Sequence, residues 1–461
     1  MKTKQKECHA ELVEAPLPLR PNRFNEAVEM LRQAQHDRLD ILKINSMKFL
    51  LFLLLLLPRL AAAQHWPRLP LDSVLRRVAR DNPRLRQYDA QIKAAGAYAK
   101  GARTWAPPKV GAGPFMVPYA ARQASDNSPV MRQGSIMLSV EQAIPNPARL
   151  RANERYLQSR AGVEQESRAY ERNQLLADTR QNYYAWALLR KKQRVLDGTE
   201  VLLRFVIRSI ELRYKYGGEK LSDAFRAKAE LLRHHAEEME VQGQIDEKRI
   251  ALNTLMNRHP DEQFEIDSTY IRPDYRDAPD TAALARARSD VRRLDRTLAR
   301  THLQQELELT SRKPEYGVQY QHMNALSSNG SNLYTLQGMV SIPIAPWAAR
   351  GYKANVAGLG LEAQALREQR AALVAQAKGK ASGLLARLHA KGGQVEMYEK
   401  NILPTVLKSY RATLLAYEQN TEELTAVLQA WETLRATRLE AVNQEMEYVQ
   451  LQTDYEREIE Q

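Results

Sequence analysis

The chain has 461 residues, of which 44% are hydrophobic and 27% charged, and its formal net charge is +13. This composition indicates a folded protein, and a single cysteine, Cys8, excludes a disulfide framework and a thiolate metal site. The positive charge and the basic stretch 284–300 would suit nucleic-acid binding. Because residues 47–63 read as an export signal, as described next, we interpret the stretch 284–300 as a solvated helix face instead.

The first element is a secretory signal peptide at residues 47–63, which read MKFLLFLLLLLPRLAAA. A lysine, an apolar run and small residues predict cleavage near Ala63. The apolar run is shorter than the roughly twenty residues that span a membrane as a helix. Because a long polar segment in front of a signal would hinder export, we expect Met47 to be the true start. Residues 1–46 would then be a start-site artefact, and a genuine cytoplasmic extension is the alternative.

The remaining chain contains one unit twice, over residues 64–257 and 281–461, joined by a connector at 258–280 that is rich in proline and aspartate. The segment ARLRAN at 148–153 returns as ARGYKAN at 349–355. Near the middle of each copy the offset is 203 positions, as three residue pairs show: Tyr214 and Tyr417, Leu221 and Leu424, Ser222 and Thr425.

Each copy begins with an amphipathic helix, expected over 71–104 and 281–312, which prolines end. The pattern then changes to alternation between apolar and polar residues, which predicts strands joined by polar, turn-forming loops. The four strands are expected at about 109–120, 132–145, 315–325 and 333–344.

These strands have one apolar and one polar face. In SIMLSVEQAI, Ile136, Leu138 and Val140 alternate with Ser139 and Glu141. Strands of about ten residues with this pattern are typical of a transmembrane barrel, with lipid outside and water inside. An ordinary soluble hairpin, half buried on a core, is the alternative. Four strands cannot close a barrel, and an open edge is not viable in lipid, so membrane-spanning strands would require several chains to share one barrel.

A very long helical run follows each strand pair, from about Ala148 to Arg213 and from about Ala348 to Ala416. Some 65 residues of helix extend about 100 Å, which no globular core can bury, so each run must pack against a returning helix. The returning helices are expected at 222–256 and 423–458. Apolar residues at heptad-like spacing precede each turn: Leu203, Ile207, Ile210 and Tyr214, and Leu403, Val406, Tyr410, Leu414 and Tyr417.

The two-copy plan, the paired strands and the long hairpins resemble the TolC-type outer-membrane factors, or outer membrane efflux proteins. The resemblance covers residues 64–460, and LPLDSVLRRVARDNPRLRQYDAQIKAA is similar to the family's opening helix. It implies a mainly α fold with a small membrane β-barrel: a homotrimer with a twelve-stranded barrel in the outer membrane of a Gram-negative bacterium and an α-helical tube in the periplasm. The implied function is a passive exit duct of a tripartite efflux or type I secretion system. Its partners would be a periplasmic adapter and an RND-type or ABC-type inner-membrane pump.

The resemblance also implies roles for the hairpin ends. Contact with the adapter is expected at Tyr214, Gly217, Gly218, Tyr417, Asn420 and Thr421. A periplasmic aperture is expected at Ser222, Asp223, Tyr417 and Glu422. Asn420 replaces the usual glycine, and asparagine tolerates a left-handed backbone.

Glu422 stands where the family has an arginine, which puts the aperture's salt bridge in question, because Glu422 and Asp223 would repel each other. Lys220 or Arg213 could compensate, or the mouth could close less firmly. Ala426 and Gln429 occupy the positions of the family's acidic ring. The simpler interpretation of these residues is a turn in which Ser222 or Asp223 caps the returning helix.

We expect no enzymatic activity, cofactor or metal site, because the sequence has no nucleophile motif and no phosphate loop. His234 and His235 are neighbours on a helix, and His322 and Met323 lie on opposite faces of a strand, whereas metal pairs on helices are spaced by three or four residues.

The alternative function is a periplasmic coiled-coil adapter or structural protein without a pore. An adapter would have a lipoyl or barrel domain that interrupts a single hairpin. The sequence does not indicate whether the substrate is a drug, a metal ion or a polypeptide.

Overall fold

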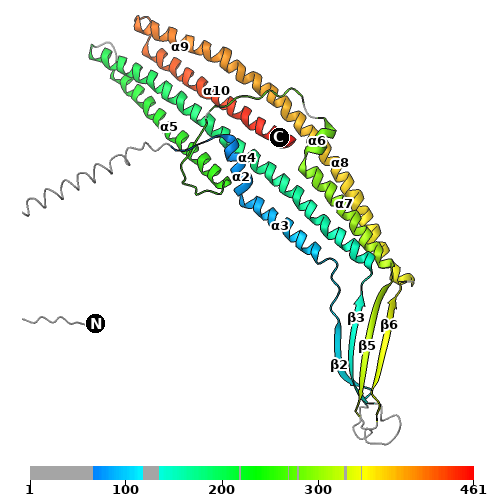
Figure 1. Ribbon diagram of the computed structural model, residues 1–461. Coiled ribbons are helices and arrows are strands. Elements are labelled where there is room, and N and C mark those ends of the chain that lie inside the picture. Colours follow the sequence, from blue (N-terminus) through cyan, green and yellow to red (C-terminus); the bar gives the residue numbers. More distant parts are fainter. Residues whose placement is uncertain are drawn as a thin grey trace, which may run out of the picture. The chain divides into compact units, whose positions relative to one another are not determined.

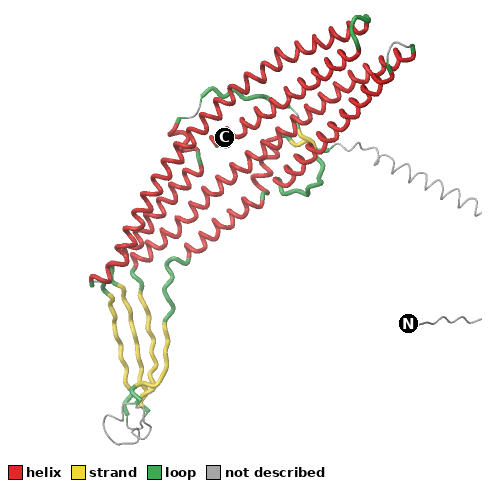
Figure 2. Tube along the Cα trace, turned by 180° about the vertical axis from the view of Figure 1, so that it is seen from behind, coloured by secondary structure: helices red, strands yellow, loops and turns green. Residues whose placement is uncertain are grey.

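Two long helical hairpins and a four-stranded sheet make up most of the described chain (Figures 1 and 2). The computed structural model describes residues 66–117, 134–216, 220–267, 269–277, 280–326, 330–343 and 345–460. The predicted extension and signal peptide, and the glycines Gly217 and Gly218, lie outside these residues. The described residues from Pro67 onward form one structural unit.

The same order of elements occurs twice. The first repeat contains β1 Arg68–Leu69, α2 Leu71–Asp81, α3 Pro83–Lys100, β2 Lys109–Phe115, β3 Ser135–Ile144, α4 Pro147–Lys215 and α5 Leu221–Leu255. The second contains α6 Thr281–Ala287, α7 Ser289–Leu309, a 3₁₀ turn Thr310–Arg312, β5 Glu315–Ala325, β6 Leu333–Ser341, α8 Pro346–Met397, a π-helical turn Tyr398–Ile402, α9 Leu403–Glu418 and α10 Leu424–Ile459. The connector carries β4 Glu265–Ile266.

The helix predicted at the start of each repeat is two helices, so this expectation was wrong in both copies. In the first, Pro83 forces the preceding Asn82 out of the helical region, and Asn82 then caps α3. Its Oδ1 accepts from Arg84 N at 2.9 Å, while its Nδ2 donates to Leu255 O at 2.9 Å. In the second repeat the break falls at Arg288, which has no proline after it.

Arg288 leaves the helix because its buried side chain is held from two sides. Its Nη2 lies 2.6 Å from Asp290 Oδ2, and its Nη1 bonds both the side chain of Glu458 and the Glu458 carbonyl, the latter at 2.8 Å. The break therefore ties the α6–α7 junction to the end of α10. One of the two partners, Glu458, lies 170 positions away in the sequence, and a helical periodicity cannot reveal such a contact.

All four long strands pair antiparallel in the order β2-β3-β5-β6, so the central pair joins the two repeats. The register aligns Val110, Val140, Tyr320 and Leu336 in one row, and these side chains are 74%, 42%, 44% and 69% exposed. The adjacent row is Gly111, Ser139, Gln321 and Thr335. The predicted separation into an apolar and a polar face is confirmed, and the apolar face is not covered by the chain's own core.

Two strands are shorter than expected. β2 ends at Phe115, before Met116 with its positive φ of 55°, and the rest of the predicted strand, from residue 118, lies outside the described residues. β6 ends at Ser341, two residues before Pro343, which has no backbone N–H to donate.

The helix α4 is 69 residues long and contacts α2, α3, α5, α7 and α10. It begins at Pro147 behind Asn146, whose side chain accepts from Ala148 N at 2.9 Å. The strands extend from the end of the helices where α4 begins, and the hairpin turns lie at the other end (Figure 1). Among the described residues, no helix combines the length and apolarity needed to cross a membrane.

The outgoing helix of the second hairpin is interrupted by the π-helical turn at 398–402, which periodicity did not predict. Pro404 lies two residues after this turn, and it cannot donate the backbone bond that a regular helix would use there. The wider turn accommodates the proline, as single π-helical turns commonly do inside long helices. The helix then continues to Glu418.

The connector lies across both hairpins and is held by tyrosine hydroxyls from α4, from α10 and from the connector itself. β4 pairs with β1 in parallel, and Tyr183 Oη bridges them, donating to Leu69 O at 3.1 Å and accepting from Asp267 N at 3.0 Å. Farther along, Tyr275 Oη donates to Glu456 Oε1 at 2.6 Å, and Tyr448 Oη donates to Pro273 O at 3.2 Å. The connector thereby links α4 of the first hairpin to α10 of the second.

We expect Asn82→Ala to lower the free energy of unfolding by about 1–2 kcal/mol, because it removes the cap of α3 and leaves the Leu255 carbonyl without its donor. Asn82→Asp keeps the cap acceptor and should lose less. The measurement is thermal unfolding followed by helical circular dichroism. Asn355→Ala is the control, since that exposed asparagine bonds only Glu308, at 3.1 Å. Equal unfolding temperatures for the two alanine variants would contradict this role of Asn82.

Candidate functional site

The ends of the two hairpins share one apolar core, which joins the first repeat to the second. Its buried members come from α4, α5, α9 and α10: Leu203, Val206, Ile210, Ala227, Tyr410, Tyr417, Leu424, Val427, Leu428, Trp431 and Leu434. Trp431 is fully buried, and its Nε1 donates to the Thr199 carbonyl at 3.0 Å. The heptad-like positions belong to this core, except Leu403 and Tyr214, the latter 45% exposed. The two hairpin ends therefore form one packed body.

The turn of the second hairpin is a Schellman motif, in which Asn420 adopts the left-handed conformation with φ of 58°. Thr421 N donates to Ala416 O at 2.9 Å, and Asn420 N donates to Tyr417 O at 3.1 Å. Both bonds satisfy carbonyls that the helix end would otherwise leave without partners. The predicted tolerance of asparagine for this backbone is confirmed.

Arg213 of the first hairpin binds the turn of the second. Its Nη1 donates to Asn420 Oδ1 at 2.7 Å, and its Nη2 donates to Tyr417 O at 2.8 Å. The guanidinium also lies over the Tyr417 ring, 4.1 Å from the centroid. A cation is favoured here because the Tyr417 carbonyl belongs to the negative end of α9. The sequence suggests Arg213 as a residue that could compensate for Glu422. In the structure, Arg213 binds Asn420 and Tyr417.

The other predicted aperture residues do not meet within one chain. Ser222 and Glu422 are exposed, and Asp223 is half-buried in the first turn of α5. The residue that precedes α5 is Lys220, and no side chain caps this helix, so the interpretation of Ser222 or Asp223 as a cap was wrong. Around them Tyr216, Leu221 and Phe225 are large, apolar and exposed. The first hairpin end thus presents apolar and acidic side chains to its surroundings.

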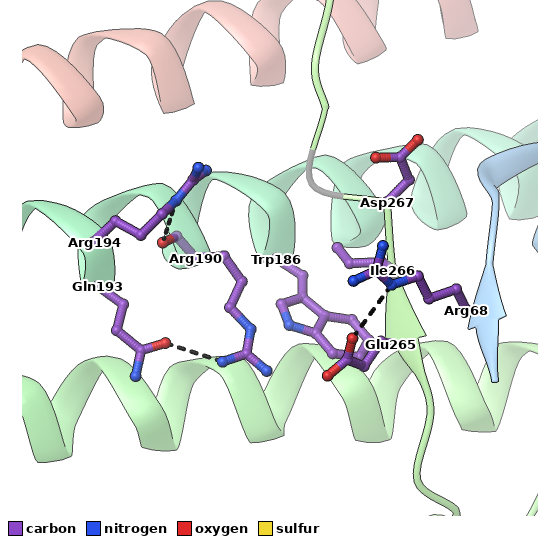
Figure 3. Close-up of a pocket in the computed structure, with 8 residues that line it drawn as sticks. All are labelled: Arg68, Trp186, Arg190, Gln193, Arg194, Glu265, Ile266 and Asp267. Atoms are coloured by element: carbon purple, nitrogen blue, oxygen red, sulfur yellow. Dashed lines mark hydrogen bonds and ion pairs between the residues drawn. The ribbon is translucent and has the colours of Figure 1, made fainter. Parts of the chain in front are cut away.

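A polar pocket of about 330 Å³ lies where β1 and β4 cross α4 (Figure 3). Its lining contains three arginines and two carboxylates: Arg68, Arg190, Arg194, Glu265 and Asp267, with Trp186, Gln193 and Ile266. The guanidiniums already have partners, since Arg190 Nη1 donates to Gln193 Oε1 at 3.0 Å and Arg68 Nε lies 3.6 Å from Glu265 Oε2. The near balance of charge gives this pocket no clear preference for an anion.

The structure gives His235 a partner that sequence spacing did not reveal. Its Nε2 lies 3.1 Å from Glu200 Oε1, which comes from α4, 35 positions earlier. Hydrogen bonds from His235 and from Arg204 hold the pKa of the Glu200 carboxyl below its usual range. Only the rotation of α4 against α5 brings these groups together, so no local pattern could have indicated them.

Comparison with known proteins agrees with this architecture. The family model described as "Outer membrane efflux protein" matches residues 74–258, which is most of the first repeat. No curated protein matches the chain. The alternative of an adapter required a single hairpin interrupted by a lipoyl or barrel domain, whereas the described residues form two hairpins, a four-stranded sheet and the short pair of β1 and β4.

Several solved structures are similar over 84% of this chain. The outer-membrane channel OprN matches with a TM-score of 0.68 and 15% identity over 89% of its length. The outer membrane protein VceC from Vibrio cholerae matches with a TM-score of 0.66 and 16% identity over 95% of its length. The open state of the MtrE outer membrane channel from Neisseria gonorrhoeae matches with a TM-score of 0.60 and 15% identity over 88% of its length. The predicted resemblance is therefore confirmed: the first repeat matches the outer membrane efflux protein family, and the described chain has the fold of the outer-membrane channels.

Proposed function

We propose that the chain is the outer-membrane channel of a tripartite efflux or type I secretion system. The observation that carries this proposal is the uncovered apolar face of the sheet, which runs across all four strands at the end of two hairpins about 100 Å long. A soluble hairpin would bury that face on a core. A membrane-spanning barrel turns it toward lipid and the polar face toward water.

The two edges of the sheet support assembly from several chains. β2 and β6 are each paired on one side only within the described chain. Unpaired backbone groups are too costly in hydrocarbon, so each edge must meet the edge of another copy. A trimer, the number that the family resemblance implies, would supply twelve strands and one closed barrel, while the hairpins would form a tube in the periplasm.

The hairpin ends support contact with a periplasmic adapter. The first end exposes Tyr214, Tyr216 and Phe225, and the second exposes Asn420 and Thr421. An inner-membrane pump of RND or ABC type would supply both the energy and the choice of substrate. The channel would act as a passive duct whose mouth lies near Ser222, Asp223, Tyr417 and Glu422.

Electron microscopy of the chain extracted from outer membranes in mild detergent tests the proposed assembly. We expect three-fold particles with a tube of about 100 Å. Small monomeric or dimeric rods in the soluble periplasmic fraction would contradict the channel function, and the strands would then be a soluble hairpin.

The orientation of the strands is tested by Leu336→Arg against Gln337→Arg. Leu336 lies on the apolar face, where an arginine at the bilayer midplane costs about 2–4 kcal/mol per chain. We therefore expect Leu336→Arg to reduce the amount of assembled oligomer in outer membranes, measured by native gel electrophoresis. Gln337→Arg adds the same charge on the opposite face and should assemble normally. Equal losses in both variants would contradict the assignment of the lipid-facing side.

The mouth is tested by Glu422→Arg, which would replace the expected repulsion between Glu422 of one chain and Asp223 of a neighbouring chain by an attraction. We expect a lower single-channel conductance in planar bilayers, because the ends should close more firmly. Adding Asp223→Asn should restore much of the conductance, and Glu423→Arg, an exposed neighbour, should change it little. A drop that persists in the double variant would place the mouth elsewhere.

A further inference from the structure

Three potential metal donors lie together where α4 and α5 pack, within the first hairpin. The donor atoms of Glu200, His235 and Glu238 all lie within 4.8 Å of one another. The side chains of these three residues are 20%, 37% and 28% exposed, so the group is partly enclosed yet open to an ion from solvent. His234, the neighbour of His235 on α5, is fully buried beside Glu238 and is not a member of this group.

The contacts of His234 place one unsatisfied polar atom beside the group. Its Nε2 lies 3.0 Å from the Leu196 carbonyl and 3.3 Å from Thr199 Oγ1. Its Nδ1 has no hydrogen-bond partner among the described residues and lies 3.5 Å from Glu238 Oε1. A buried ring nitrogen thus faces a carboxylate that belongs to the three donors.

We propose that Glu200, His235 and Glu238 bind a divalent transition-metal ion such as Zn²⁺, with a fourth position open to water. Ligand atoms about 2.1 Å from a tetrahedral zinc stand roughly 3.4 Å apart. The observed separation of 3.1 Å between His235 Nε2 and Glu200 Oε1 is close to that edge, and the other two separations are no longer than 4.8 Å.

The chemistry of the donors selects the ion. An imidazole with two carboxylates suits Zn²⁺ and its neighbours better than Ca²⁺ or Mg²⁺, which prefer oxygen ligands alone. His235 and Glu238 are three positions apart on α5, so they project toward the same side. Glu200 reaches His235 from α4.

One competing cation lies at the site. Arg204 Nη2 is 2.5 Å and its Nε 2.7 Å from Glu200 Oε1. The arginine side chain is 57% exposed, so it can turn to solvent, and a surface ion pair of this kind contributes little to stability. A bound metal ion would replace Arg204 as the positive partner of Glu200.

The second hairpin provides an internal comparison. At the offset of 203 positions, Glu200, His235 and Glu238 correspond to Leu403, Arg438 and Ala441. None of these can ligate a metal ion. The site therefore belongs to the first hairpin alone, where it would clamp α4 against α5 below the turn.

Titration with Co²⁺ tests this site, because tetrahedral Co²⁺ has strong visible absorption and substitutes for Zn²⁺. The complete, untagged chain in detergent should bind one Co²⁺ per chain, and Zn²⁺ should displace it. We expect His235→Gln and Glu238→Gln each to weaken binding at least about tenfold. The control is His259→Gln, since His259 is exposed and lies beside a single carboxylate, Asp261, at 3.5 Å.

Thermal unfolding of the same proteins separates loss of a ligand from loss of the fold. Zn²⁺ should raise the unfolding temperature of the original chain and of His259→Gln but not that of Glu238→Gln, and the three should unfold alike in chelator. Absence of stoichiometric Co²⁺ binding, or binding that Glu238→Gln leaves unchanged, would overturn the proposal. These readouts do not depend on the channel function.

Discussion

The length of α4 is the constraint on which the rest of the structure depends. A helix of 69 residues extends about 100 Å and has an apolar side that it cannot bury alone. It meets α3 and α7 along one part of its length and α5 and α10 along another. Four shorter helices from both repeats are thus held in one bundle by a single long one. Because the unit occurs twice, the second repeat supplies α7 and α10 as packing partners of α4.

The same constraint separates the molecule into ends with different chemistry. At one end the strands leave the bundle, and their apolar face stays uncovered because no helix reaches it. At the other end the chain must reverse twice, and the turns are joined by Arg213, Tyr417 and Asn420. Between them the connector ties α4 to α10 through tyrosine hydroxyls. Membrane and periplasmic roles can therefore be assigned to different parts of one rigid scaffold.

The two repeats share an architecture but not their polar details. The first breaks its opening helix at a capping asparagine, and the second breaks it at a buried arginine with two carboxylates. Glu200, His235 and Glu238 of the first hairpin have no equivalents in the second. Backbone geometry requires only that apolar positions face the shared cores. The polar residues can therefore differ between the two repeats, and the differences between the repeats lie in these residues.

Local patterns in the sequence determined the repeat, the strand faces, the long hairpins and the left-handed turn at Asn420, because each depends on residue type and near-neighbour spacing. They also indicated the family, through the order of elements rather than through one motif. Only the tertiary structure decided the break at Arg288, the pairing of β1 with β4, the contact of Arg213 with Asn420 and the meeting of His235 with Glu200. Each of these joins residues 35 to 207 positions apart, and whether they meet depends on how one helix or strand is rotated and shifted against another. Periodicity identifies which side of a helix is buried but not which residue of another helix lies opposite it.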